Sequence, residues 1–290
     1  MIGMFKRRYK LVVYKGYIYG GDGDKDGCNE YNPNLDSWTA KTNIPAPTRN
    51  NLAASSILNK GYIYGGGNSG YADCDEYDPN TNTWDNKTDM PSQIRYGLAA
   101  STINNKGYIY AGYYTSFLQD CDEYDPDLWT NMTDLPAPGR MRLAASTISS
   151  KGYIYGGDAG GADECDEYTP DGGTGTWAEK TDIPAPYRYW LAASTISDKG
   201  YIFGGSDLTT ASLQDTDEYD PDTWTAKTDC PLPARKGHAS STINDIGYVY
   251  GGIDVAGLQD CDEYNPDTWT NKTDIPTIYR YFLAASTLGI

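Results

Sequence analysis

The sequence predicts an all-β fold, a β-propeller with six blades of four antiparallel strands each. The stretch KGYIYGG, or a close variant of it, occurs six times along the 290 residues. The first Gly of each pair recurs at steps of 45, 46, 45, 48 and 47 residues, with Ala111 in its place in the third copy. Between these glycines the chain shows short β-type segments and no helical period. A repeat of this length made of short strands is typical of propeller blades.

Each repeat contains four segments that read as strands, bounded by Gly, Pro, Asn or Asp. In the third copy they are LAASTI at 98–103, YIYAG at 108–112, DCDEYDP at 120–126 and WTNMTDLP at 129–136. The small residues of the first segment suit the innermost strand, because blades crowd together near the axis. One blade cannot bury both of its faces alone, so six must stack into a ring.

The two ends of the chain are expected to close the ring. The first copy has RRYKLV where the other copies have LAAS, whereas the chain ends in LAASTLGI at 283–290. We therefore expect residues 283–288 to form the innermost strand of the first blade, whose other strands lie between residues 16 and 45. This pairing would remove the open edge of the sheet. The alternative is a seventh repeat that begins at Leu283 and continues in a longer chain. We expect a single domain at 10–290 and a tail or linker at 1–9.

The repeat resembles the Kelch repeat across almost the whole chain. That family is marked by a Gly pair ending strand two, a Tyr in strand three, a Trp starting strand four and an Arg before the next strand one. The Tyr and Trp pairs are Tyr31 with Trp38, Tyr77 with Trp84, Tyr124 with Trp129, Tyr168 with Trp177, Tyr219 with Trp224 and Tyr264 with Trp269. The resemblance implies that partners dock where the strand-four-to-one and strand-two-to-three loops gather around the channel.

The charge excludes one class of partner and the hydropathy excludes another. Acidic residues outnumber basic ones by 40 to 23, for a formal net charge of −17. Such a field repels a phosphate backbone, so no nucleic-acid partner is expected. No stretch approaches 18 consecutive apolar residues, so no membrane insertion is expected either.

Five of the six cysteines occupy one repeat position, and we expect them to be small buried residues without disulfides. Equivalent sites in different blades should lie too far apart for a disulfide or for shared metal coordination. Unpaired cysteines favour folding in a reducing cytoplasm, and later display on a virion or cell surface stays open. The five are Cys28, Cys74, Cys121, Cys165 and Cys261, with Thr216 at the remaining copy.

One acidic loop carries a weak calcium signal. Asp22, Asp24 and Asp26 alternate before Gly27, as in the first half of a calcium-binding loop. The twelfth position of such a loop is Pro33, which offers no side-chain oxygen. The alternative is an acidic surface loop, and no other cofactor is expected.

The candidate binding residues lie beside the repeated Arg. An Arg precedes every first strand, and its two following neighbours vary and include aromatic and basic residues, the types that anchor binding. For the Arg residues alone the alternative is a structural role, in which each guanidinium bridges backbone carbonyls. The candidates are Arg49, Arg95, Tyr96, Arg140, Arg142, Arg188, Tyr189, Trp190, Arg235, Lys236, Arg280, Tyr281 and Phe282.

The sequence favours a non-enzymatic binding or scaffold module that recognises a protein or a glycan, as part of a larger assembly or surface structure. The single histidine, His238, stands where the other copies place Leu, and the acids of DCDE recur in nearly every copy. Neither pattern indicates a catalytic centre, and one histidine is too few for the copper oxidases that some similar propellers form. The alternative is a carbohydrate-active enzyme, an epimerase or lyase, as in other propellers of this kind.

Overall fold

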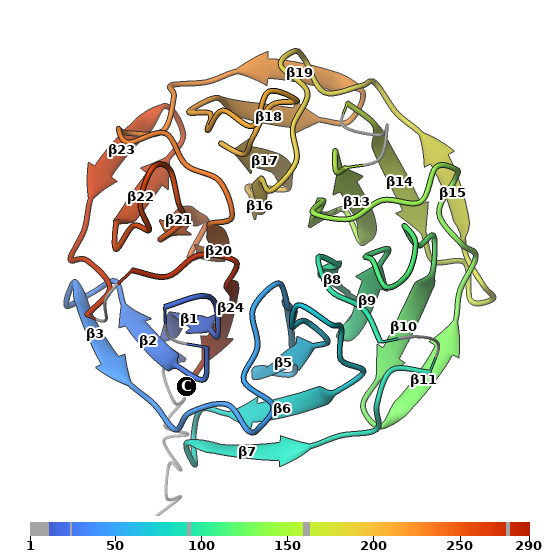
Figure 1. Cartoon of the computed structure of the whole chain (residues 1–290), viewed down its shortest axis with the longest axis horizontal. Coiled ribbons are helices and arrows are strands. Elements are labelled where there is room, and N and C mark those ends of the chain that lie inside the picture. Colours follow the sequence, from blue (N-terminus) through green and yellow to red (C-terminus); the bar gives the residue numbers. More distant parts are fainter. Residues whose placement is uncertain (1–11, 24, 92–93, 159–162, 277–278) are drawn as a thin grey trace, which may run out of the picture.

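The computed structural model describes residues 12–23, 25–91, 94–158, 163–276 and 279–290. Six four-stranded antiparallel sheets stand around a central axis like the blades of a propeller (Figure 1). Every regular element in these ranges is a strand. The predicted all-β, six-bladed fold is therefore confirmed. The predicted tail at 1–9 lies outside the described residues.

The strands of each blade run outward from the axis in chain order, except that the last strand is innermost in blade one. Blade one contains β24 (Ala284–Gly289), β1 (Tyr14–Tyr19), β2 (Cys28–Asn32) and β3 (Ser37–Ala40). Blades two and three contain β4 (Ala53–Ile57), β5 (Lys60–Tyr64), β6 (Cys74–Asp78), β7 (Thr83–Asn86), β8 (Ala99–Ile103), β9 (Lys106–Tyr110), β10 (Cys121–Asp125) and β11 (Leu128–Asn131). Blade four contains β12 (Ala144–Ile148), β13 (Lys151–Tyr155), β14 (Cys165–Thr169) and β15 (Thr176–Glu179). Blades five and six contain β16 (Ala192–Ile196), β17 (Lys199–Phe203), β18 (Thr216–Asp220), β19 (Thr223–Ala226), β20 (Ala239–Ile243), β21 (Ile246–Tyr250), β22 (Cys261–Asn265) and β23 (Thr268–Asn271).

The ring closes as predicted, through the C-terminal strand. β24 pairs antiparallel with β1, with Gly16 opposite Thr287 and Ile18 opposite Ala285. Val13 and Ile290 extend the ladder through two backbone hydrogen bonds of 3.0 and 3.1 Å. In Figure 1 the red C-terminal strand lies beside the blue first strand. Blade one therefore joins the two ends of the chain in one sheet.

The second strand is buried on both faces, because it lies between two neighbouring blades. In β9, Gly107, Tyr108, Ile109 and Tyr110 are all buried, whereas burial alternates along the innermost strands such as β8. The glycine has a steric reason: a Cβ at Gly107 would lie 2.5 Å from the Tyr64 hydroxyl of the preceding blade. The same tyrosine hydroxyl lies 2.8 Å from the Ser55 hydroxyl.

One blade shows how this packing depends on tyrosine. In β17 the second tyrosine of the motif is Phe203, which has no hydroxyl. A Cβ at the facing Gly247 would lie 3.6 Å from the Phe203 ring, so the tight contact is relieved there. Ser194, which would otherwise face a tyrosine hydroxyl, donates instead to Ser240 at 3.1 Å.

Aromatic side chains fill the spaces between blades. Tyr124 and Trp129 of blade three have ring centroids 4.7 Å apart, and Tyr64 of blade two meets Trp129 edge-on at 5.8 Å. The indole Nε1 of Trp129 also donates to the Thr88 carbonyl of blade two at 2.7 Å. These residues bury apolar area and keep their polar tips bonded, as aromatic residues in cores do.

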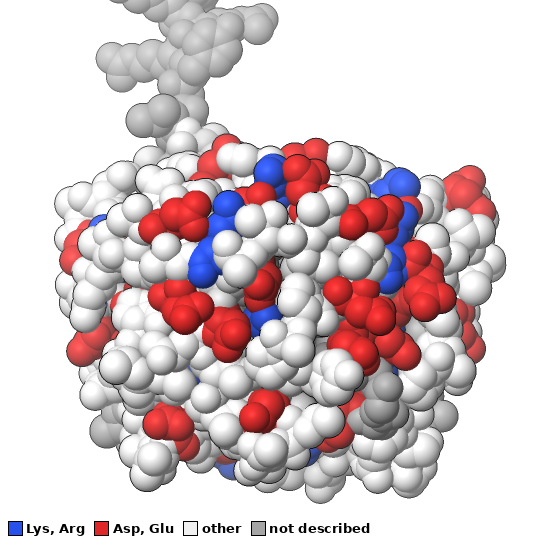
Figure 2. Space-filling model, turned by 90° about the horizontal axis from the view of Figure 1, so that it is seen from above, with Lys and Arg blue, Asp and Glu red and all other residues white. Residues whose placement is uncertain are grey.

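The five cysteines of the repeated position are buried and free, which confirms the prediction made for them, and Cys230 is buried and free as well. Figure 2 shows one side of the disc, where acidic side chains outnumber the lysines and arginines among them. In the part of the chain that the structure describes, no helix is long and apolar enough to cross a bilayer.

Candidate binding face at the channel mouth

The six repeated arginines are buried, with at most 1% of each residue exposed. Each one ties the connection that enters a blade to the third strand of that blade. Burial raises the pKa of the partner Asp75, Asp166 and Asp262, although the neighbouring guanidinium acts to lower it. This environment supports the structural role of the Arg set. The pairs are Arg49 with Asp75, Arg95 with Asp122, Arg140 with Asp166, Arg188 with Asp217, Arg235 with Asp262 and Arg280 with Asn29.

The backbone carbonyl of each of these arginines contacts the preceding blade. It accepts a hydrogen bond from the second Gly of the pair there, for instance from Gly66 N to Arg95 O at 2.9 Å. The first position of each pair has a left-handed φ between 47° and 60°, including Ala111 at 55°. That turn is what brings the next amide to the neighbouring blade, and glycine adopts it most easily.

The residue two positions after each arginine belongs to a closed ring of backbone hydrogen bonds, which we call the mouth ring. Each amide donates to the carbonyl of the equivalent residue in the preceding blade, at 2.6–2.9 Å. All six residues have left-handed φ between 52° and 64°. The bonds run from Asn51 to Phe282, Gly97 to Asn51, Arg142 to Gly97, Trp190 to Arg142, Gly237 to Trp190 and Phe282 to Gly237.

Three bulky side chains of the mouth ring stack on one another. The Arg142 guanidinium lies 4.1 Å from the Trp190 ring centroid, and the Trp190 and Phe282 centroids are 4.9 Å apart with planes inclined by 31°. Phe282 also covers Gly237, where a Cβ would lie 2.5 Å from its ring. Cation–π and aromatic contacts of this kind hold the side chains in place. The structure thus brings three predicted binding residues from three blades together.

Neighbouring side chains extend this stack. Tyr189 meets Trp190 at 5.2 Å and Tyr281 meets Phe282 at 5.0 Å between ring centroids. The Lys236 ammonium lies 5.8 Å from the Trp190 ring and donates to the Thr210 carbonyl at 2.6 Å. Two cationic groups therefore stand beside one indole. Tyr96, the remaining predicted residue, stacks instead on Tyr113 at 5.6 Å.

Arg142 is only partly neutralised by its own chain. Its guanidinium pairs with Asp158 at 2.8 Å, and its side chain keeps 26% of its area exposed. Asp158 follows the Gly pair of the same blade, at a backbone bridge to Met141. The guanidinium therefore presents an open edge beside the aromatic stack.

Below the ring lies a cavity of about 80 Å³, lined by ring residues and by the leucines that begin the innermost strands. His238 replaces one of these leucines. Within the described residues, at least one ring nitrogen of His238 has no hydrogen-bond partner, and the same holds for Nε1 of Trp190. Burial lowers the pKa of His238 to about 3, and the Arg235 charge acts in the same direction, whereas a hydrogen bond to the Phe203 backbone acts to raise it. His238 is therefore neutral at pH 7.

The loops that follow the Gly pairs carry exposed apolar side chains around the mouth. The Tyr113 and Phe117 rings meet edge-on at 5.3 Å, and Phe117 is 38% exposed. Val255 is 96% exposed at the tip of the loop after β21. Exposed residues of this kind on these loops, together with those on the loops that carry the arginines, are Tyr114, Phe117, Tyr187, Leu208, Leu232, Val255 and Tyr279.

The acidic loop of blade one shows other partners for two of its three aspartates. Asp22 pairs with Lys25 at 3.1 Å, and Asp26 accepts a hydrogen bond from Asn43 at 2.9 Å. Asp24 lies outside the described residues. Within the described ranges no group of three or more His, Cys, Asp or Glu side chains is placed to hold a metal ion. Calcium binding stays a prediction, and a thermal unfolding midpoint raised by calcium over EDTA would support it.

Sequence reasoning missed half of the mouth ring. Asn51, Gly97 and Gly237 hold the same ring positions as the stacked residues. They were not predicted as site residues, because their side chains are small. The available signal was positional, since each stands two residues after the repeated arginine. Tyr113 and Phe117 were also missed as partners of Tyr96, because they come from a loop of variable length.

The comparisons with known proteins identify the fold. No protein-family model matches the chain, and no curated protein matches its sequence. Among solved structures 395 chains match. One of them, described as the structure of YjhT, aligns with a TM-score of 0.77 at 15% identity, over 92% of this chain and 99% of that chain. At this identity the likeness supports the six-bladed β-propeller fold alone, and the Kelch family stays a resemblance.

Proposed function

We propose that this propeller is a non-enzymatic binding module of the Kelch type, which recognises a protein partner through its channel mouth. It would serve as a subunit of a larger assembly or of a surface structure, including a viral or cell-surface one. The face meant here comprises the mouth ring, the residues that stack on it and the exposed loop tips around it.

The observation that carries this proposal is the contrast between a repeated scaffold and an unrepeated surface. Buried arginines, Gly pairs and aromatic packing recur in blade after blade, and their contacts lie within the scaffold. Arg142, Trp190 and Phe282 occupy ring positions that Asn or Gly fills in other blades, so folding does not require their bulk. Large aromatic and guanidinium groups at places where the scaffold tolerates glycine are typical of binding surfaces.

The chemistry of the face favours a protein surface with an acidic segment. Arg142 and Lys236 supply positive charge at the mouth of an otherwise acidic molecule, and carboxylates bind well to such groups. The exposed apolar tips, such as Phe117 and Val255, extend the contact area beyond the mouth. A glycan would use the aromatic stack but not these outlying tips, so it is the second choice.

A matched set of variants tests this proposal on protein and glycan arrays. Arg142→Asn and Trp190→Asn place at each position the residue that blade two carries in its equivalent, Asn51, so both should fold. Binding seen with the native chain should fall about tenfold or more in each variant, as loss of an anchoring side chain does. Leu128→Thr, a change at the far end of the strands to the residue found in blades five and six, should bind like the native chain.

The proposal fails if the two mouth variants bind every array ligand as well as the native chain does. If the native chain binds only glycans on the arrays, the ligand of the channel mouth is a glycan and not a protein. The alternative of a different class, an epimerase or lyase, predicts turnover on a glycan panel that is lost when one acidic residue is replaced.

A further inference from the structure

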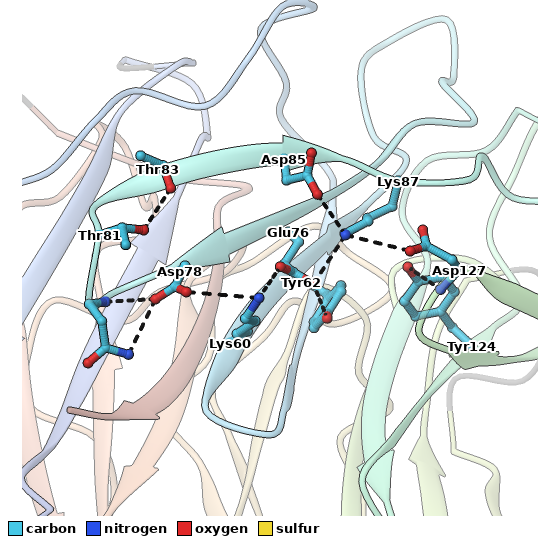
Figure 3. A network of polar contacts seen from close by, with 11 residues as sticks. Lys60, Tyr62, Glu76, Asp78, Thr81, Thr83, Asp85, Lys87, Tyr124 and Asp127 are labelled. Carbon is cyan, nitrogen blue, oxygen red and sulfur yellow. Dashed lines mark hydrogen bonds and ion pairs between the residues drawn. The ribbon is translucent and has the colours of Figure 1, made fainter.

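Neighbouring blades are joined by a lysine latch, defined as the Lys after the fourth strand whose ammonium faces the third-strand Glu of its own blade. Figure 3 shows the latch of blade two. The Lys87 ammonium lies 3.6 Å from Glu76 Oε2 and 3.6 Å from Asp127 Oδ2 of blade three. Glu76 also pairs with Lys60 and accepts a hydrogen bond from Tyr62. One ammonium therefore links two blades at the end of the strands opposite the channel mouth.

Five of the six blades carry this lysine at the same place. In each of them its ammonium lies within 3.6 Å of Oε2 of the glutamate. In three of them it also reaches an aspartate of the next blade at 3.5–3.6 Å. The five pairs are Lys41 with Glu30, Lys87 with Glu76, Lys180 with Glu167, Lys227 with Glu218 and Lys272 with Glu263.

Blade three departs from this pattern on both sides of its junction with blade four. Met132 stands where the other blades have the latch lysine. Gly175 of blade four stands two residues before the Trp, where blades one, three, five and six have an aspartate and blade two has an asparagine. Glu123 is retained, and it keeps the Lys106 ammonium at 2.7 Å and a hydrogen bond from Tyr108. The cation and its distal partner are thus both replaced, whereas the central carboxylate stays.

The junction remains ordered without the latch, and an open cavity lies beside it. Thr133 holds the turn of blade four by donating from Oγ1 to the Gly175 carbonyl at 2.8 Å and from its amide to the Thr174 carbonyl at 2.9 Å. The cavity measures about 360 Å³. Its walls include Lys106, Tyr108, Glu123, Met132, Tyr168 and Gly172, and Lys106 holds the other carboxylate oxygen of Glu123, Oε1. A methionine side chain is one atom shorter than lysine and carries no charge, so it does not supply the ammonium that Glu123 Oε2 would otherwise face.

We propose that this junction cavity binds a primary alkylammonium group, such as a lysine side chain of a partner or a free amine. The bound ammonium pairs with Glu123 Oε2, as the latch lysine pairs with the equivalent glutamate in the other five blades. Its alkyl chain packs against Met132 and Tyr168, while the net charge of −17 concentrates cations near the surface. This site is separate from the channel mouth, so the proposal does not depend on the proposed function.

Ligand-observed saturation-transfer NMR with the full chain tests the proposal at 0.15 M salt, which screens loose ion binding. The probes are n-butylammonium, Nα-acetyl-lysine amide and, as a control, tetramethylammonium, which is a cation that cannot donate hydrogen bonds. We expect saturation transfer to the two primary amines and little to the control. Transfer to acetyl-lysine amide shows that the site accepts a lysine side chain, whereas transfer to butylammonium alone restricts the site to free amines.

Three variants place the signal at the cavity. Met132→Lys restores the latch residue of the other blades and should abolish transfer, because the new ammonium fills the position. Met132→Leu is the matched control, which keeps the side chain apolar and should preserve binding. Glu123→Gln should weaken binding roughly tenfold, because it removes the charge of the acceptor. Equal transfer to the native chain and Met132→Lys, or to the amines and tetramethylammonium, would overturn the proposal.

Discussion

His238 is a polar residue at a position of the mouth lining that is otherwise apolar. The other five blades place leucine at this position, and the histidine is just as buried. A hydrogen bond to the Phe203 backbone can serve only one of its two nitrogens, so at least one of them has no partner within the described residues. An unsatisfied buried polar group typically costs about 1–3 kcal/mol, so this residue should lower the stability of the fold.

His238→Leu should therefore raise the free energy of unfolding by about 1–3 kcal/mol at pH 7. The gain should increase on acidification, because the pKa of His238 is about 3 in the folded chain against an ordinary 6.5. Between these values the unfolded chain binds the proton and the folded chain does not, so the native protein loses stability as pH falls from 6.5 towards 3. Urea unfolding at pH 7.5 and pH 5.0 measures both effects.

Leu98→His, the reverse change at the equivalent position of blade three, provides the control. It should lose more stability at pH 5.0 than at pH 7.5. If native and His238→Leu chains showed parallel stability from pH 7.5 to pH 5.0, the assignment of a low pKa to His238 would be wrong.

For single residues, the sequence showed which side chains recur in the repeat, but it did not show which of them are buried. Arg188 and Trp190 are adjacent and were both proposed as binding residues, yet Arg188 is 1% exposed and paired with Asp217, whereas Trp190 stacks at the mouth. A repeated arginine can serve either purpose, and only the position of its carboxylate partner decides between them. That partner lies 29 residues away on β18, in a register that no local pattern reveals.

Among the larger elements, the lysine latch links strands two, three and four of one blade to the next. Burial acts to raise the pKa of Glu167, but hydrogen bonds from Lys151, Tyr153 and Lys180 lower it to about 2. A carboxylate with a depressed pKa stabilises the fold fully above its unfolded value, here 4.5, and this contribution disappears as pH falls towards 2.

Glu167→Gln should consequently lower the thermal midpoint at pH 7. Between pH 4.5 and pH 2 the thermal midpoint of this variant should fall less than that of the native chain. Differential scanning calorimetry over this range measures both. Glu179→Gln, at an exposed residue of the same blade, is the matched control and should leave both quantities close to native. An acid profile unchanged by Glu167→Gln would show that the latch does not contribute to acid sensitivity.

The strands were largely predictable, because every repeat contains them in the same order and turn residues lie at their ends. The second strand, for example, was recognised from KGYIYGG, and its glycine and tyrosines are explained by contacts to the preceding blade. The break in the repeat at Met132 was not recognised. It is a single buried apolar residue directly after β11, and its meaning depends on Gly175 of a different blade.

At the scale of the whole molecule, stability depends on closure between the two ends of the chain. β24 supplies the innermost strand of blade one, and its Leu288 is fully buried. Ser56 of blade two also donates to the Thr287 carbonyl at 2.7 Å, so β24 contacts more than its own sheet. Loss of this strand would expose the edge of β1 and one side of the neighbouring blades.

Removal of residues 284–290 should therefore destabilise the entire ring rather than one blade. We expect a large fall in the thermal midpoint, a broader transition and aggregation through the exposed edge, as seen by circular dichroism and light scattering. A synthetic peptide of residues 283–290 added in excess should restore part of the midpoint. A truncated chain that melts like the native one would show that closure does not control stability.

The mouth ring has a consequence for how such a face could change its specificity. Its six hydrogen bonds use only backbone atoms, so the side chains at these positions are not needed to hold it. The left-handed φ is the remaining constraint, and it disfavours β-branched residues most strongly. A library randomised at 51, 97, 142, 190, 237 and 282, without Val, Ile and Thr, should yield many folded members with different ligands. The ring is thereby a ready framework for selecting new binders.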